Sequence, residues 1–315
     1  LTCIAHRGPD DQGVYEQGRA VLGHRRLSII DTSSGGHQPF ADDGGRYTMV
    51  FNGEVFNFQE LRAQLEAEGH TFRSQSDTEV VLRLYTVKGP AFLHDLNGFF
   101  ALAIHDKEQD TLFLARDRYG IKPLWWAEAD GRFLFASELR ALIALGAERE
   151  LDRTSLRQYL SYYYIPAPES VFTGAHKLLP GHSLLVDASG VREERWYDIV
   201  EASKKVERSN DPQKTLFDLM DDAVRLRLIA DVPVGAFLSG GVDSSIVSAL
   251  ATRHHKGLHT FSIGYVDDPF FDETHHAEEV ARHIGSEHST FKLTREELAE
   301  NYTRLLDAMD EPFAD

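Results

Sequence analysis

The residues best suited to chemistry are Ser239-Gly240-Gly241-Val242-Asp243-Ser244, which lie between an apolar run and a helical pattern. The apolar run at 232–238 predicts a buried strand, the glycines permit a tight turn, and the serines can cap the following helix. Backbone N–H groups and the helix dipole at such a turn attract an anionic group. The segment therefore predicts a phosphate-binding loop rather than an ordinary strand-to-helix turn.

Asp243 sits where its carboxylate would repel a phosphate unless a divalent cation lies between them. Its presence therefore predicts a magnesium-bound nucleotide. The spacing of a Walker A loop, with its Gly-Lys-Ser/Thr ending, is absent from this chain.

The elements around this loop alternate between strands and helices. Apolar periodicity predicts helices at 215–228, 245–253, 274–284 and 294–309, and strands at 232–238, 259–265 and 289–293. This alternation predicts a parallel sheet that binds nucleotide at the carboxyl ends of its strands. Residues 201–213 are polar and charged, which is typical of a linker.

The first 200 residues have a different pattern, in which many short strands are interrupted by helices. We expect strands at 47–51, 111–115, 124–127, 132–136 and 183–186, and helices at 58–68, 77–88 and 138–145.

Five motifs occur in this first part, in the order His6-Arg7-Gly8-Pro9-Asp10, Arg26-Leu27-Ser28-Ile29-Ile30-Asp31, Phe51-Asn52-Gly53-Glu54-Val55-Phe56-Asn57, Ser76-Asp77-Thr78-Glu79 and Arg116-Asp117-Arg118-Tyr119-Gly120-Ile121-Lys122-Pro123. The later loop resembles that of the ATP pyrophosphatase (PP-loop) family. Together the motifs resemble glutamine-hydrolysing asparagine synthetases of the B type, across nearly the whole chain. That resemblance implies an ATP-dependent ligase that makes asparagine from aspartate, ATP and glutamine through β-aspartyl-AMP.

The resemblance also implies two domains. Residues 1–200 would form a class II glutamine amidotransferase domain, an αββα sandwich of the N-terminal nucleophile hydrolase type. Residues 214–315 would form the first part of a doubly wound, parallel-sheet ATP-binding domain, after the linker at 201–213.

The same resemblance assigns glutamine binding to Arg26, Leu27, Ser28, Ile29, Ile30, Asn52, Gly53, Glu54 and Asp77. Arg26 suits the substrate α-carboxylate, and Asp77 and Glu54 suit its α-ammonium group. The Asn52 amide and the Gly53 N–H would form an oxyanion hole.

For the nucleotide, the resemblance assigns the adenosine moiety to Leu238 and Ile263 through backbone and apolar contacts, although a plain core position is the better expectation for the Ile263 side chain. Pyrophosphate and Mg²⁺ are assigned to Ser239, Gly240, Gly241, Asp243 and Ser244, with Asp243 as the metal ligand.

Simpler structural roles remain open for several of these residues. Asn52-Gly53 is typical of a tight β-turn, Asp77 of a helix N-cap, and Arg26 of a solvated surface arginine. An acidic group at Asp267, Asp268, Asp272 and Glu273 could approach a metal, but a solvated loop and helix start are the better expectation. The ordered occurrence of all the motifs argues against coincidence.

Composition narrows the class of protein. A formal net charge of -17 and the absence of Lys/Arg runs argue against nucleic-acid binding, and no apolar run reaches membrane-spanning length. One cysteine among 315 residues excludes an internal disulfide framework, so we expect a reducing cytoplasm. The residues do not specify an oligomeric state, and a homodimer stays open.

The chain departs from the family pattern at both ends. It starts at Leu1 and lacks the N-terminal Cys-Gly nucleophile of the family. Cys3 is followed by Ile4, so we expect Cys3 to be a small, buried or half-buried residue without a catalytic role. A distal Ser-Gly-x-Gly-x-Asp-Glu segment of the family is also absent. The 315 residues by themselves are therefore expected to be inactive.

Two rival functions stay open. One is a paralogous synthetase that adenylates another carboxylate to form an amide or β-lactam, and the other is an inactive chain that only binds glutamine or nucleotide. The intact residues at Arg26, Asn52, Gly53, Glu54 and Asp77 count against the first.

Overall fold

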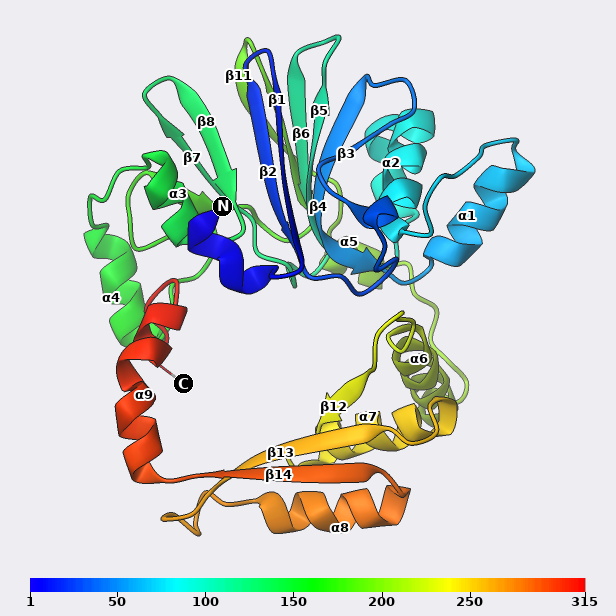
Figure 1. The fold of residues 1–315 in the computed structure, drawn as a ribbon, viewed down its shortest axis with the longest axis vertical. Helices are drawn as coiled ribbons and strands as arrows, with labels where there is room; N and C mark the ends of the chain where they lie inside the picture. Colours follow the sequence, from blue (N-terminus) through cyan, green and yellow to red (C-terminus); the bar gives the residue numbers. More distant parts are fainter. Residues whose placement is uncertain (315) are drawn as a thin grey trace. The chain divides into compact units, whose positions relative to one another are not determined.

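The computed structural model describes residues 1–314 and divides into two compact units. Unit 1 comprises Leu1–Val206 together with the segment that starts at Met309, and unit 2 comprises Glu207–Ala308. Figure 1 labels most of the elements of both. Every helix among the described residues is too short or too polar to span a lipid bilayer.

Unit 1 is built on a six-stranded antiparallel sheet in the order β11-β10-β6-β5-β4-β3. Its strands are β3 (Phe40–Ala41), β4 (Tyr47–Val55), β5 (Gly98–Asp106), β6 (Thr111–Arg116), β10 (His182–Asp187) and β11 (Gly190–Arg195). A second β layer consists of the hairpin β1 (Asp11–Gln17)–β2 (Ala20–Arg26) and the small sheet of β7 (Trp125–Ala129), β8 (Arg132–Ala136) and β9 (Ala175–Lys177).

The helices of unit 1 flank these layers. They are η1 (Thr2–Arg7), η2 (Ser34–Gly36), α1 (Phe58–Ala67), α2 (Asp77–Lys88), η3 (Gly89–His94), α3 (Leu139–Leu145), α4 (Arg153–Tyr162) and α5 (Ile199–Ser203).

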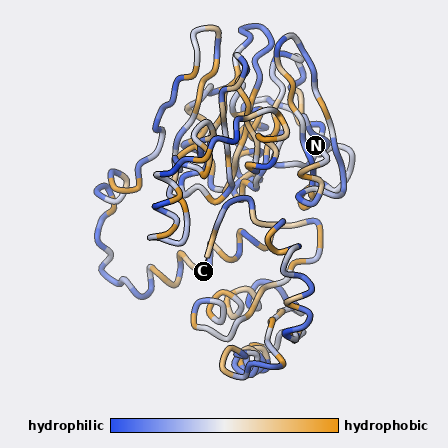
Figure 2. The backbone as a smooth tube through the Cα atoms, turned by 90° about the vertical axis from the view of Figure 1, so that its left-hand side faces the viewer, coloured by the Kyte–Doolittle hydropathy of each residue, from blue (hydrophilic) through white to orange (hydrophobic). Residues whose placement is uncertain are grey.

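Strand alternation explains how the layers of unit 1 pack. Along β4, Met49 faces the helical layer, and Val50 points the other way into a core shared with Leu22 of β2 and Leu114 of β6. Tyr85 of α2 stacks on Phe113 of β6 with ring centroids 5.6 Å apart. Figure 2 shows hydrophobic residues concentrated along the strands and hydrophilic residues at many of the loops. This order of layers confirms the predicted αββα sandwich.

Unit 2 contains a three-stranded parallel sheet in the order β12-β13-β14. Its elements are α6 (Pro212–Leu226), β12 (Gly235–Phe237), α7 (Val242–His254), β13 (His259–Tyr265), α8 (Thr274–Ile284), β14 (Glu287–Leu293) and α9 (Arg295–Ala308). The predicted alternation of strands and helices in a parallel sheet is thus confirmed.

Two local expectations differ from the structure. The strand expected at 232–238 is restricted to β12, because Pro233 has no N–H to donate to a ladder. The expected linker at 201–213 begins inside α5, whose first amides, those of Val200 and Glu201, donate to the Asp198 carboxylate at 2.8 and 3.3 Å.

Candidate active sites

Asn52 and Gly53 lie inside strand β4, so the simpler expectation of a β-turn at this dipeptide is wrong. Asn52 shares a strand face with Val50 and lines a pocket of about 1090 Å³ in unit 1. Its Nδ2 donates to Ser137 Oγ at 3.4 Å, which leaves its second N–H free to stabilise a developing oxyanion. Gly53 is required sterically, since a Cβ here would lie 2.3 Å from the carbonyl oxygen of Phe99.

Asp77 is the first residue of α2, and the N-cap is Ser76, whose Oγ accepts from the Thr78 amide. The simpler expectation of Asp77 as the N-cap is therefore wrong by one position. The buried carboxylate instead accepts from the Val55 N–H at 3.0 Å, at the end of β4. Burial raises the pKa of Asp77 to about 6, although the hydrogen bond from Val55 opposes that rise. This contact brings Asp77 beside the backbone that follows Glu54.

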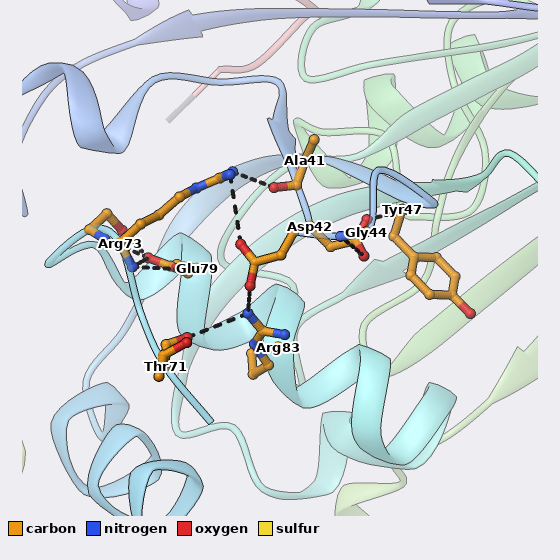
Figure 3. A network of polar contacts seen from close by, with 10 residues as sticks. Ala41, Asp42, Gly44, Tyr47, Thr71, Arg73, Glu79 and Arg83 are labelled. Carbon is orange, nitrogen blue, oxygen red and sulfur yellow. Dashed lines mark hydrogen bonds and ion pairs between the residues drawn. The ribbon is translucent and has the colours of Figure 1, made fainter. Parts of the chain in front are cut away.

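A polar network holds the loop that leads into Asp77 (Figure 3). The buried Glu79 carboxylate accepts from Ser74 N at 2.7 Å, from Ser74 Oγ at 2.6 Å and from Arg73 N at 3.0 Å. Arg73 also pairs with Asp43, as does Arg83, so the turn between β3 and β4 is tied to the same loop. Glu79 of the Ser76–Glu79 motif thus positions the backbone at Arg73 and Ser74, in the loop before α2.

Arg26 is buried, not a solvated surface arginine. Its guanidinium donates to the carbonyl oxygens of Ile30 and Ser33, both at 3.1 Å, and to that of Asp31. Arg26 thus organises the loop that carries the rest of its motif, and its role in binding a substrate carboxylate stays a prediction.

The other residues of the Arg26 motif are disposed differently. Leu27 is exposed, Ile29 is half-buried and Ile30 is buried. The Ser28 amide donates to Asp10 Oδ2 at 2.8 Å, which joins this motif to His6–Asp10.

The sequence reasoning did not assign roles to a group of charged residues beside Asn52. Glu138 is buried and pairs with His6 at 2.8 Å, Arg7 at 3.2 Å and Arg140 at 3.1 Å. Arg7 lines the same pocket as Asn52. The presence of His6 and Arg7 in one of the five motifs was the available signal, but Glu138 stands outside all of them.

The motif at 116–123 forms a loop that is organised around a buried carboxylate. The fully buried Asp117 carboxylate accepts from four backbone N–H groups, those of Phe100, Tyr119, Ile121 and Lys122. The loop places Lys122 Nζ 4.7 Å from the centroid of the Phe99 ring. Burial, reinforced by Arg7, lowers the pKa of Lys122, and Glu54 opposes this effect, so Lys122 lies in the electrostatic field of the predicted glutamine site.

In unit 2, the loop between β12 and α7 has the geometry of an anion cradle. Gly240 has φ of +86°, and a Cβ there would lie 2.6 Å from His276 Cβ, so only glycine fits. The hydroxyl groups of Ser239 and Ser244 are hydrogen-bonded to each other at 2.9 Å, and Ser245 Oγ donates to Gly241 O at 2.7 Å. The first amides of α7 point out of the helix end without intrahelical acceptors. These donors suit a phosphate chain.

The two residues assigned to adenosine differ in burial. Leu238 is buried against Ala277 and Ala281 of α8, and its N–H donates to Phe261 O at 2.8 Å. Ile263 is 56% exposed on β13, so the simpler expectation of a core side chain is wrong. With Phe237, Phe261, Phe291 and Leu293, Ile263 lines an apolar hollow of about 330 Å³.

Asp243 lies in the first turn of α7, exposed beside the cradle, where its carboxylate suits a cation that bridges to phosphate. Residues 1–314 contain no group of three or more His, Cys, Asp or Glu side chains in a metal-binding arrangement. In the acidic group at 267–273, Asp272 instead binds Thr274 Oγ1 at 2.7 Å and Lys292 at 2.9 Å, which confirms the structural expectation for this residue.

Comparisons with known proteins divide the chain in a similar way. Residues 1–197 match the family described as glutamine amidotransferase domain, and residues 215–315 match asparagine synthase. "Asparagine synthetase [glutamine-hydrolyzing] 1" of Bacillus subtilis is 36% identical over 99% of this chain and 49% of its own length. "Asparagine synthetase B [glutamine-hydrolyzing]" of Escherichia coli is 32% identical over 93% of this chain and 50% of its own length.

The chain thus spans about half the length of these curated relatives. Among solved structures, the glutamine phosphoribosylpyrophosphate amidotransferase of B. subtilis matches with a TM-score of 0.51 and 18% identity, covering 100% of this chain and 91% of that one. That likeness concerns the fold alone.

Proposed function

The chain belongs to the glutamine amidotransferase domain family and carries an asparagine synthase part from residue 215, and on that premise we propose that it takes part in glutamine-dependent asparagine synthesis. Its resemblance to glutamine-hydrolysing asparagine synthetases is borne out by both matches and by the named relatives. The observation that carries the proposal is the presence, in one chain, of Asn52, Gly53 and Glu54 on β4 beside the buried Asp77 and of the anion cradle at Gly240.

In unit 1 we propose that glutamine is bound and that the thiolate of the family's nucleophilic cysteine, which is not among these 315 residues, attacks its side-chain amide. Ammonia would leave from the tetrahedral intermediate, and water would hydrolyse the remaining thioester to glutamate. Asn52 Nδ2 has one N–H directed to Ser137 and a second for the oxyanion, which the Gly53 N–H would share. Asp77 and Glu54 would hold the α-ammonium group, and Arg26 with the loop Leu27–Ile30 would hold the α-carboxylate. The ammonia released is the nitrogen source for the second site.

In unit 2 we propose that ATP is bound with its phosphates on Ser239, Gly240, Gly241 and Ser244, and its adenosine against Leu238 and Ile263. The side-chain carboxylate of aspartate would attack the α-phosphorus, pyrophosphate would leave, and ammonia would then displace AMP. Asp243 suits a Mg²⁺ ion, which when bound would neutralise charge on the pyrophosphate.

Other features of the proposal rest on the sequence. The domain limits of 1–200 and 214–315, with a linker at 201–213, are retained as proposals. A reducing cytoplasm is consistent with the single cysteine, and the substrates are small molecules, with no nucleic acid involved. The oligomeric state is not assigned, and a homodimer is one candidate.

The test is to supply the full-length protein with aspartate, ATP and glutamine labelled with ¹⁵N at the side-chain amide. We expect labelled asparagine, with AMP and pyrophosphate formed in equal amounts. Aspartate is then replaced by other carboxylic acids to test the rival synthetase. Formation of ADP and phosphate, or a better yield with another carboxylate, would contradict the proposal.

A further inference from the structure

The short helix α3 is capped by a residue 171 positions away in the chain. Its own N-cap residue, Glu138, makes no side-chain cap. Instead the Asp310 carboxylate accepts from the backbone N–H of Leu139 with one oxygen and from that of Arg140, at 2.9 Å, with the other. A carboxylate at this end satisfies two otherwise unpaired amides and suits the helix dipole.

The residues around Asp310 are held to unit 1 as well. Glu311 accepts from the Val171 N–H at 2.9 Å and pairs with Lys177 Nζ, and the Ala314 N–H donates to Tyr163 O at 3.0 Å. Burial raises the pKa of Glu311, while its contacts with Lys177 oppose that rise. The segment 310–314 is therefore fixed at three places and does not merely lie on the surface.

Glu138 does not cap α3 because its carboxylate serves other partners. The Glu138 carboxylate pairs with His6 and Arg7 of η1 and with Arg140 in the first turn of α3. Arg140 Nε lies 3.1 Å from Glu138 and 3.4 Å from Asp310, so this guanidinium bridges the two carboxylates. Asp310 thus completes a charged cluster in which neither carboxylate can replace the other.

The cluster reaches the predicted oxyanion donor through one residue. Ser137 immediately precedes Glu138, and its Oγ accepts from Asn52 Nδ2 at 3.4 Å. Ser137 lies between the end of β8 at Ala136 and the N-cap residue of α3, Glu138, so a shift in the start of α3 would move Ser137. Because oxyanion donors act only within narrow distance limits, a small displacement of Ser137 would redirect the Asn52 amide.

We propose that Asp310 is a positioning residue for glutamine hydrolysis, which acts on the Asn52 amide through the start of α3 and Ser137. This inference rests on the proposed function, in which Asn52 stabilises the oxyanion. The segment that contains Asp310 follows α9 directly along the chain. Residues that come after unit 2 in the sequence would therefore support the proposed glutamine site in unit 1.

The experiment measures steady-state glutamine hydrolysis by the full-length protein with Asp310→Asn, Asn52→Ala, and both together. The substituted carboxamide would present its N–H₂ group to one of the two backbone amides that need an acceptor. We expect Asp310→Asn to lower kcat about tenfold and leave KM for glutamine within about twofold, since one donor is misplaced but not removed. The matched control is Glu300→Gln, a charge removal at an exposed position of α9, which should leave both constants unchanged.

The double variant distinguishes positioning from general support. If Asp310 acts through Asn52, the double variant is no slower than Asn52→Ala alone, because the donor that Asp310 aims has gone. Multiplied losses, or a rise in KM with kcat unchanged, would overturn the inference.

Two further outcomes are separable. A loss with Asn52→Ala but none with Asp310→Asn refutes the positioning role and leaves the proposed function intact, whereas an unaffected Asn52→Ala refutes both. If Asp310→Asn does not fold, Glu311→Gln takes its place: it keeps the cap but loosens the segment, and a two- to threefold loss of kcat is expected. No loss in that variant would reject the inference.

Discussion

Asp77 should make glutamine binding depend on pH. Moving this carboxyl from its ordinary pKa of 3.8 to about 6 costs the ionised form roughly 3 kcal/mol in the folded chain. The stability contributed by the neutral form is fully present below pH 3.8 and is lost as the pH rises through 6. If Asp77 holds the α-ammonium group of glutamine as proposed, glutamine prefers the ionised carboxylate and must displace a proton from Asp77 below pH 6.

The competition between a proton and glutamine at Asp77 sets the size of the change in KM. One proton competes with one ligand, so KM for glutamine should rise about tenfold between pH 7 and pH 5. Asp77→Asn keeps an oxygen for the Val55 N–H but loses the charge. In that variant we expect KM to be roughly ten- to a hundredfold higher at pH 7, through loss of a charged hydrogen bond, and nearly independent of pH. The assay is glutamate release by the full-length protein from pH 5 to pH 8.

A buried carboxylate elsewhere in unit 1 provides the control. Asp106 pairs with Arg46 at 2.7 Å near the end of β5 and has no place in the predicted site. Asp106→Asn should lower thermal stability at pH 7 and retain the tenfold change in KM. A flat KM in the unaltered protein, or the same rise at low pH in Asp77→Asn, would refute a direct role for Asp77.

Three further changes test other residues in the full-length protein. Asp243→Asn should abolish ATP–pyrophosphate exchange while glutamine hydrolysis persists, since the cation bridge is lost only at the nucleotide site; unchanged exchange would reduce Asp243 to a helix-start residue. Gly240→Ala should raise KM for ATP far more than Gly257→Ala, because both have positive φ but only Gly240 has a neighbour within 3 Å of the added Cβ, and equal effects would argue against a tight cradle. Cys3→Ser, at a half-buried position of η1, should leave glutamine hydrolysis within about twofold, and abolished turnover would show that Cys3 takes part in catalysis.

Local sequence patterns predicted those elements whose limits are set locally. Helix α2 occupies the predicted residues because Ser76 caps it and Gly89, with φ of +57°, follows its last turn. Strand β13 and helix α8 also have their predicted limits. The strand before the nucleotide loop was predicted too long, since apolar character alone does not reveal that Pro233 cannot join the ladder.

The candidate sites were less accessible to the same reasoning. Asn52-Gly53 has the composition of a turn, and only the approach of Phe99 across the β4–β5 pair explains a glycine in mid-strand. The contact between Asp77 and Val55 spans 22 residues, and the cap of α3 by Asp310 spans 171. Such contacts depend on how the layers pack, and no periodicity within one element encodes them.

The central proposal, that a glutamine-hydrolysing site and a separate ATP site work together in the full-length protein, is tested most directly through Asn52. In the full-length protein, asparagine formation by Asn52→Ala is measured with glutamine and again with free ammonia as the nitrogen source. We expect the glutamine-dependent rate to fall about 10²- to 10³-fold, because one oxyanion donor is removed, and the ammonia-dependent rate to stay within about twofold. A parallel loss of both rates, or no loss of either, would contradict the account.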